Sequence, residues 1–365
     1  MRAVVVAVVA VAASGGVATA YPQFQLSKDQ ACTACHVDPA GGWLLNENGL
    51  STAQSLGTYD VAPEAAHGAL VGPSWLEVGA ELRGGAGLVA ARGLGAAAYP
   101  MQADGEALVH GDGFTLFGTL GPQQGSTAAS YVASREHWLM WQPDQSATDG
   151  LYLRVGRFMP VFGLRFAEHT APTEQYGGAQ LYGEAYGAAL EYVKPGWEAH
   201  VTGFVHDPIQ DTVEHGDGAA LYTELRVTQA ASIGVEGRYA TSSVDTRWDG
   251  GVTAKYWVAP AEVLLEAEGQ VIRQSFPAGS ARTQLVSYLI GSWFVHRGWM
   301  LDVGAGQYDE DTKIKDVDLE CVDVDLHWFA SSHWELLVTD RVQTIALGAG
   351  GPTSGWALLQ FHYRL

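Results

Sequence analysis

The sequence has few basic residues, only three cysteines and, beyond its first twenty residues, no long apolar run. Its 20 Lys and Arg are outnumbered by 40 Asp and Glu, which gives a formal net charge of −20 at pH 7. A surface this acidic is unsuited to a nucleic-acid partner. Solubility of an exported protein explains the acidity, and attraction of cations is the alternative. Because no later segment offers about 18 consecutive uncharged apolar residues, no transmembrane helix is predicted.

Residues 1–20 predict a secretory signal peptide. Arg2 is followed by an apolar run over residues 3–13, and Ala18-Thr19-Ala20 forms an A-x-A cleavage site before Tyr21. The apolar run is too short to cross a bilayer as a helix. We therefore expect an exported mature chain that, if it enters a membrane, does so without helices.

Glycine and aromatic residues are abundant and indicate β-structure. The chain has 45 Gly in 365 residues, with 12 Trp and 15 Tyr, and this glycine content is well above the usual ~7 %. Beyond Trp75, apolar and polar residues alternate with the period of a strand. In one segment the first face holds Ala261, Val263, Leu265, Ala267 and Val271, and the second holds Glu262, Glu266, Glu268 and Gln270. In another, Val322, Val324, Leu326 and Trp328 oppose Cys321, Asp323, Asp325 and His327.

The connections between these strands distinguish a membrane barrel from a soluble sandwich, which also alternates. Short turns such as residues 110–113 and 296–298 alternate with longer polar loops, which begin at Gly121, His206, Thr241, Gln274 and Asp309. Short turns at one end and long loops at the other are typical of bacterial outer-membrane barrels. We predict an all-β fold over residues 74–365, an antiparallel transmembrane β-barrel of about 16 strands.

Two of the three cysteines lie in the run Cys32-Thr33-Ala34-Cys35-His36. Its spacing is that of the C-x-x-C-H haem attachment motif of c-type cytochromes. Each cysteine of such a motif forms a thioether with one vinyl group of the same porphyrin, and the adjacent histidine reaches the iron as proximal ligand. We predict one covalent haem c bound through Cys32 and Cys35, with His36 as the proximal ligand of the haem iron.

Other chemistries of the cysteine pair stay open. An oxidising compartment permits a disulfide between Cys32 and Cys35. A zinc site would need a second ligand pair at short spacing, and a thioredoxin-like pair would need a βαβ context; the sequence offers neither. Residues 39–42 allow a tight turn, and residues 43–45, Trp-Leu-Leu, offer apolar cover for a flat ligand or anchor an ordinary loop. A short helix is expected near residues 47–55.

The run CTACHVDPAGGWLLNENG, from Cys32 to Gly49, resembles the fused monohaem cytochrome-porins of bacterial outer membranes. The segment LYLRVGRFMPVFGLRFAEHTA, from Leu151 to Ala171, is also similar to one of their barrels, less distinctively. In that family a small c-type haem segment precedes a single-chain barrel. The resemblance implies that residues 21–73 form a haem-binding segment that plugs the barrel of residues 74–365.

The resemblance also implies a function and a location. The chain is expected in the bacterial outer membrane, in contact with its lipid, with the N-terminal segment on the periplasmic side or in the lumen. It would pass electrons between a periplasmic redox carrier and an extracellular donor or acceptor, as in iron oxidation, and act as an electron carrier rather than a catalyst. A third interpretation is a catalytic haem protein such as a peroxidase, which requires an open sixth coordination site on the iron. An imidazole or thioether as sixth ligand would argue against it. The alternative is a passive porin or binding barrel whose N-terminal plug is stapled by a Cys32–Cys35 disulfide.

The sequence does not identify the distal ligand of the haem iron. His67 is the first candidate because it lies in the small segment itself. Further candidates that could point into the lumen near short turns are His200, Met300, His327, His333 and His362. The carboxylates predicted to face the lumen could attract metal cations or stabilise the cationic iron, and we favour the second role. They are Glu262, Glu266, Glu268, Asp323 and Asp325. Cys321 is expected to be an inert inward residue.

Overall fold

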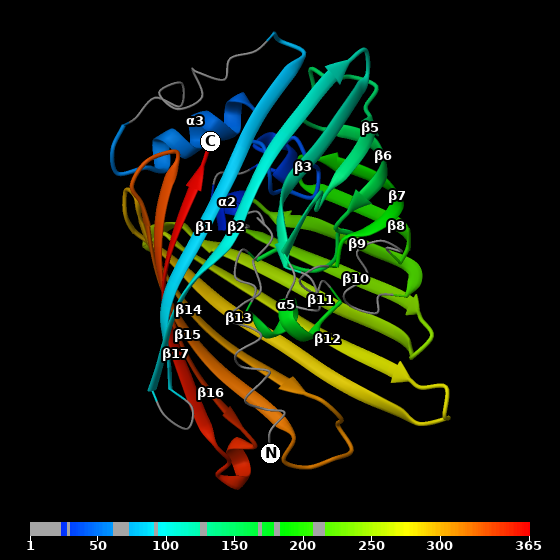
Figure 1. The fold of residues 1–365 in the computed structure, drawn as a ribbon, viewed down its shortest axis with the longest axis vertical. Coiled ribbons are helices and arrows are strands. Elements are labelled where there is room, and N and C mark those ends of the chain that lie inside the picture. Colours follow the sequence, from blue (N-terminus) through cyan, green and yellow to red (C-terminus); the bar gives the residue numbers. More distant parts are fainter. Residues whose placement is uncertain are drawn as a thin grey trace.

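The computed structural model describes residues 23–27, 30–60, 73–90, 94–124, 130–166, 170–178, 183–206 and 216–365, which form one barrel (Figure 1). The predicted signal peptide and His67 lie outside these residues. The strands are β1 (Leu76–Ala90), β2 (Leu94–Gly111), β3 (Phe114–Gln124), β4 (Ser130–Ala133), β5 (His137–Trp141), β6 (Gly150–Phe158), β7 (Ala185–Lys194), β8 (Trp197–Val205), β9 (Asp217–Thr228), β10 (Ala231–Thr241), β11 (Thr246–Val258), β12 (Val263–Ser275), β13 (Ala281–His296), β14 (Trp299–Asp309), β15 (Asp318–Phe329), β16 (Trp334–Ile345) and β17 (Thr353–Arg364).

The barrel closes by antiparallel pairing of β1 with β17, in a register that sets Glu81 opposite Arg364. The first part of β3 pairs with β5, up to the residue pair Gly118 and His137. The last part of β3 pairs with β4, beginning at the residue pair Gly121 and Ala133. Strands β4 and β5 are therefore two halves of one strand, interrupted at residues 134–136. Counted in this way the closed antiparallel barrel has 16 strands, which confirms the predicted fold class.

Alternation along the strands gives the barrel an apolar outside and a polar inside. In β15, Val322 and Val324 are 52 % and 44 % exposed, whereas Asp323 and Asp325 are buried. Asp323 meets Arg341 of β16 at 2.8 Å across the inner wall. Because outer-membrane strands turn apolar residues to lipid and polar residues to the lumen, the apolar exterior is the surface in contact with lipid.

Short helices lie at the barrel ends and inside it. They are α2 (Gln23–Ser27), η1 (Cys32–Ala34), α3 (Glu47–Leu56), α5 (Pro172–Tyr176), η3 (Ala259–Ala261) and η4 (Leu347–Ala349). The short helix expected near residues 47–55 is therefore present as α3. Over the described ranges, no helix has the length and apolar character needed to cross a membrane.

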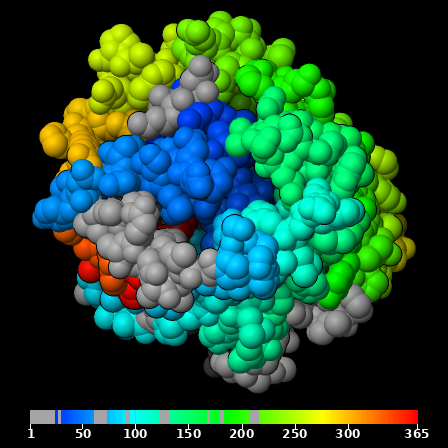
Figure 2. Space-filling model, turned by 90° about the horizontal axis from the view of Figure 1, so that it is seen from above, coloured from blue at the N-terminus to red at the C-terminus, as the bar shows by residue number. Residues whose placement is uncertain are grey.

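Two segments occupy the interior of the barrel. Residues 159–166 and 170–178, which include α5, fold inward between β6 and β7, where the backbone N–H of Leu164 donates to Glu268 Oε2 at 2.8 Å. Residues 30–60 fill the mouth at the short-turn end, as the view from above shows (Figure 2). There the side chain of Arg297, from the short turn after β13, donates to the carbonyl of Gly57 at 2.7 Å.

Several predicted long loops are shorter than the sequence suggested. Strand β3 runs on to Gln124, β11 already begins at Thr246, and only residues 276–280 connect β12 to β13. These polar residues continue the hydrogen-bonded ladder, and polarity alone does not tell a strand end from a loop. Glu262 was also misplaced: it ends η3 in the left-handed region, with φ 51°, and is exposed in a turn rather than inside the lumen.

Candidate haem-binding site

The C-x-x-C-H run forms one helical turn inside the short-turn mouth. The backbone N–H groups of Cys35 and His36 both donate to the carbonyl of Cys32, at 3.1 and 2.9 Å. This turn brings the two cysteines and His36 to the wall of one cavity. Both cysteines are free thiols. Burial raises the pKa of each thiol, so that both stay protonated at neutral pH, unlike the reactive thiolate of a thioredoxin-like pair.

The imidazole of His36 is fixed in one tautomer. Its Nδ1 lies 2.8 Å from the carbonyl oxygen of Gly42, and since a carbonyl only accepts, Nδ1 carries the proton and Nε2 carries the lone pair. Gly41 and Gly42 have φ values of 85° and 82°, which lets the chain turn back so that this carbonyl reaches the ring. Burial lowers the pKa of His36 to about 4, so the ring is neutral near pH 7. A neutral, oriented imidazole is what metal ligation requires.

The start of α3 braces the motif from the other side. The side-chain amide of Asn46 donates to the carbonyl of Thr33 at 3.1 Å, and that of Asn48 donates to the carbonyl of Ala34 at 2.8 Å. Asn46 also caps α3, because its Oδ1 accepts from the N–H of Gly49 at 3.0 Å. A Cβ on Gly49 would overlap the carbonyl oxygen of Cys35. The run LNENG therefore places the helix directly on the cysteine turn.

The cavity beside the motif has a volume of about 950 Å³, including the space at its open mouth. Its apolar walls include Phe24, Leu45, Ala53, Leu56, Phe329 and Trp334, and its polar residues include His333, Glu335, His362 and Arg364. Haem is a flat apolar ring with two carboxylates and an iron that takes nitrogen ligands. Apolar walls, two thiols, imidazoles and one arginine at a single cavity fit such a group.

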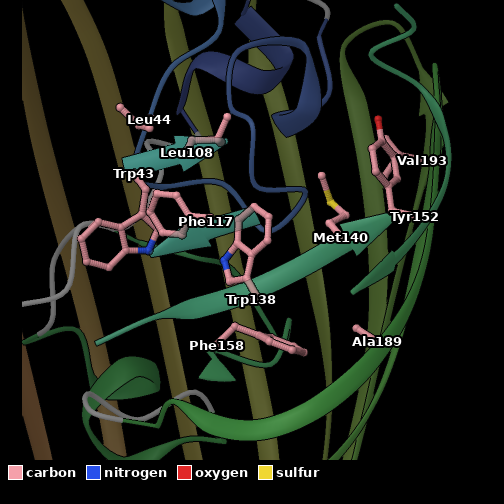
Figure 3. Close-up of a cluster of buried hydrophobic side chains, with 10 residues drawn as sticks. All are labelled: Trp43, Leu44, Leu108, Phe117, Trp138, Met140, Tyr152, Phe158, Ala189 and Val193. Carbon is pink, nitrogen blue, oxygen red and sulfur yellow. The ribbon is translucent and has the colours of Figure 1, made fainter. Parts of the chain in front are cut away.

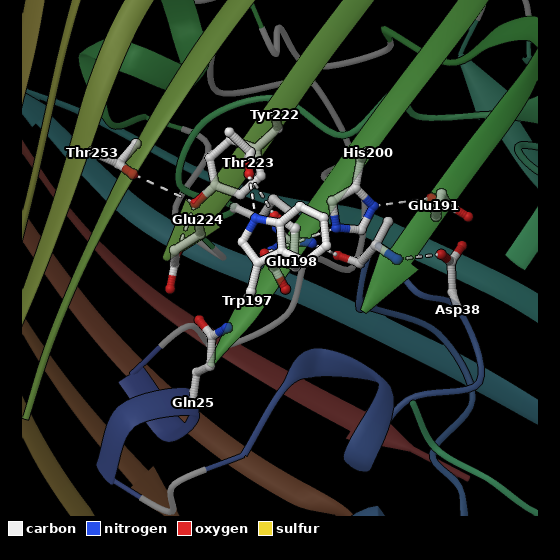
Figure 4. Close-up of polar contacts among 12 residues, drawn as sticks. Gln25, Asp38, Glu191, Trp197, Glu198, His200, Tyr222, Thr223, Glu224 and Thr253 are labelled. Atoms are coloured by element: carbon white, nitrogen blue, oxygen red, sulfur yellow. Dashed lines mark hydrogen bonds and ion pairs between the residues drawn. The ribbon is translucent and has the colours of Figure 1, made fainter. Parts of the chain in front are cut away.

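A buried ion pair holds the segment to the barrel wall. Arg154 of β6 is fully buried and binds both oxygens of Asp38, at 2.6 and 2.5 Å, while its other nitrogen meets Glu191 at 2.9 Å. His200 of β8 lies 3.3 Å from Glu191, and Figure 4 shows these two side chains with Asp38 nearby. Sequence reasoning missed Asp38 and Arg154, since 116 positions separate them.

Apolar packing strengthens the same contact. Trp43 and Leu44 are buried in a cluster with inward residues of the barrel wall, and the Trp43 ring centroid lies 6.0 Å from that of Phe117 (Figure 3). Leu45 instead lines the cavity. Of the three residues that the sequence offered as ligand cover or loop anchor, Trp43 and Leu44 thus anchor the segment and Leu45 faces the cavity.

The candidate distal ligands occupy different places. His333 and His362 line the cavity with His36. His200 lies between Glu191 and Glu198, and His327 between Asp302 and Glu335. Met300 is buried but is not part of the cavity wall. His67 lies outside the described residues. Within the described residues, no group of three or more His, Cys, Asp and Glu is arranged to hold a bare metal ion.

Comparisons with known proteins show the fold. No protein-family model and no curated protein matches the chain. Among solved structures, it is similar to OmpT of Vibrio cholerae, with a TM-score of 0.62 and 12 % identity over 81 % of this chain and 99 % of that one. It is also similar to the anion-selective porin from Comamonas acidovorans, with a TM-score of 0.59 and 12 % identity over 80 % of this chain and 99 % of that one. The chain is likewise similar to OprB of Pseudomonas putida, with a TM-score of 0.59 and 9 % identity over 80 % of this chain and 94 % of that one.

At these identities the shared feature is the porin-like barrel. Together with the apolar exterior, it assigns the chain to the bacterial outer membrane, in contact with lipid.

Proposed function

We propose that this porin-like barrel is an electron carrier of the outer membrane, with one haem c attached to Cys32 and Cys35 and His36 as an iron ligand. The observation that carries the proposal is that these three side chains share one cavity, and that His36 has its Nδ1 fixed on the Gly42 carbonyl at 2.8 Å. The bound haem would supply one-electron redox chemistry. The redox partners would be a periplasmic carrier and an extracellular donor or acceptor.

The residues of the cavity have separable tasks in this proposal. The two thiols would attach the ring, and Nε2 of His36 would bind the iron. Phe24, Leu56 and Phe329 would exclude water from the ring faces, and Arg364 would offer a cation to the ring carboxylates. Because the short turns of outer-membrane barrels lie on the periplasmic side, the cavity would open toward a periplasmic carrier.

The second candidate is a passive porin or binding barrel with an N-terminal plug stapled by a Cys32–Cys35 disulfide. The fold similarity to porins favours it. It requires that the cysteines be joined to each other rather than to a cofactor. The two candidates therefore differ in the covalent state of Cys32 and Cys35.

The test is haem staining after boiling in detergent, on full-length protein expressed in a bacterium that attaches haem c. Only a thioether-bound haem stays with the chain under these conditions. We expect stain in the wild type and in Cys321→Ala, which removes a buried cysteine away from the cavity, and none in Cys32→Ala/Cys35→Ala. An unstained wild type whose thiols become labelled only after reduction would favour the porin candidate.

A further inference from the structure

The cavity has a second histidine whose setting matches that of His36. His333 belongs to the short connection between β15 and β16, so it comes from the barrel wall and not from the N-terminal segment. Its exposed fraction is 5 %. The cavity is thus bordered by His36 from the segment and by His333 from the wall.

The ring of His333 is oriented through Nδ1. This nitrogen lies 2.8 Å from the carbonyl oxygen of Arg364, and the backbone N–H of Arg364 donates to the carbonyl of His333 at 2.9 Å. As in His36, a carbonyl partner assigns the proton to Nδ1 and the lone pair to Nε2. Both histidines therefore have the tautomer in which Nε2 is the ligating atom.

The connection that carries His333 is held from both sides. The residues that follow α3 pair with its start, because the N–H groups of Thr58 and Tyr59 donate to the carbonyls of Phe329 and Ala330, each at 2.9 Å. A Cβ on Gly57 would come within 2.9 Å of the Cα of Ser331. The N-terminal segment and the wall are thus locked together at this point, which fixes His333 relative to the cysteine turn.

The third histidine of the cavity wall is a poorer ligand. Nδ1 of His362 lies 3.4 Å from Glu335, and its Nε2 lies 3.7 Å from Glu81. Both ring nitrogens of His362 thus face carboxylates rather than a backbone carbonyl, so no carbonyl fixes its Nε2 as the ligating atom. Among the described residues of the cavity wall, the remaining imidazoles are those of His36 and His333, and the wall includes no methionine.

We propose that His333 is the second axial ligand of the haem iron, so that the site is a bis-histidine centre shared between the N-terminal segment and the barrel wall. The inference rests on the proposed function, since it presupposes a haem attached at Cys32 and Cys35. In this arrangement the small segment would supply one ligand and the barrel would complete the coordination.

The test uses optical and magnetic spectra of the purified full-length protein, with covalent haem verified first by staining. Wild type should give a low-spin spectrum with the near-infrared signature of two imidazoles. His333→Ala should keep the stain, lose the low-spin signature and bind carbon monoxide in the ferrous state. Added free imidazole should restore the low-spin spectrum, which would show that the iron has lost one ligand while the haem site has stayed intact. His362→Ala tests the other wall imidazole of the cavity and should stay low-spin.

Each contrary outcome has a definite meaning. A low-spin His333→Ala, or loss of the low-spin signature in His362→Ala or His67→Ala instead, would overturn the inference. A wild type that stains but is high-spin would overturn it and leave the proposed function intact, whereas an unstained wild type would remove both. If His333→Ala does not fold, His333→Met tests the same proposal. We expect it to give a low-spin spectrum with a changed near-infrared signature. An unchanged signature would show that His333 does not bind the iron.

Discussion

Arg154 connects the N-terminal segment to the barrel through a fully buried contact with Asp38. Removing one partner of a buried pair leaves the other charge without compensation, which typically costs about 3–5 kcal/mol. Glu191 remains beside Arg154 at 2.9 Å and absorbs part of this cost. The pair thus contributes to the free energy of docking the segment in the mouth.

We therefore expect Asp38→Ala to weaken docking of the segment by about 3 kcal/mol, which corresponds to roughly a hundredfold faster native-state proteolysis within residues 30–60. Gel electrophoresis of timed protease digests in detergent measures this rate. The control is Glu77→Gln, which alters the more exposed Glu77–His110 pair of the same mouth and should change the free energy by less than about 1 kcal/mol. Equal digestion rates for Asp38→Ala and wild type would show that this pair does not hold the segment.

The grouping of the candidate site residues was predictable where they are close in sequence. Cys32, Cys35 and His36 are adjacent in the chain, and the structure brings them to one cavity. The ion pair between Asp38 and Arg154 becomes apparent only in the folded barrel, because the two residues are far apart in the sequence. His333 was one of several distal candidates, because the sequence gives no means of knowing which short turn lies against the cysteine turn.

The helix α3 acts as a brace for the cysteine turn, and Gly49 is the point of closest approach. Its built Cβ would overlap the Cys35 carbonyl and come within 3.0 Å of the Leu45 Cβ, so any side chain there would push the helix away. Overpacking of this kind costs about 1–3 kcal/mol. The hydrogen bonds from Asn46 and Asn48 to the cysteine turn depend on the same close contact between α3 and the turn.

Gly49→Ala should therefore loosen the turn and speed amide hydrogen exchange at His36 and Asn46 by about tenfold or more, as measured by mass spectrometry. Gly348→Ala is the matched control, since a Cβ at Gly348 meets no atom within 4 Å. Its exchange at the same amides should equal that of the wild type. Unchanged exchange in Gly49→Ala would mean that α3 does not constrain the cysteine turn.

At the level of elements, the strands were predictable and their ends were not. The alternation that exposes Val322 and buries Asp323 follows directly from the two-residue period. The ends of β3 and β11 depend on how far their backbone hydrogen bonds continue beyond the membrane-facing part of the barrel. The alternation of apolar and polar residues does not determine that length. The inward fold of residues 159–166 and 170–178 was also missed, because its contacts, such as Leu164 with Glu268, lie 104 positions apart.

For the whole molecule, the barrel should be independent of the cofactor. Its strands satisfy their own backbone hydrogen bonds by closing β1 on β17, as spanning a membrane requires. We expect Cys32→Ala/Cys35→Ala to lose the haem and keep the heat-modifiable gel migration of a folded barrel. Loss of that migration would show that attachment at the cysteines is needed for the barrel to close.

The central claim is that the site in the mouth exchanges electrons with the outside of the cell. The direct measurement adds a reduced dye, linked to a polymer too large for a porin, to intact cells and follows the absorbance of the haem. The dye gives up an electron and the ferric haem becomes ferrous, so we predict a reduced haem band in wild-type cells and none in cells with Cys32→Ala/Cys35→Ala. A wild-type haem that stays oxidised with this dye, yet is reduced once the cells are opened, would contradict the claim.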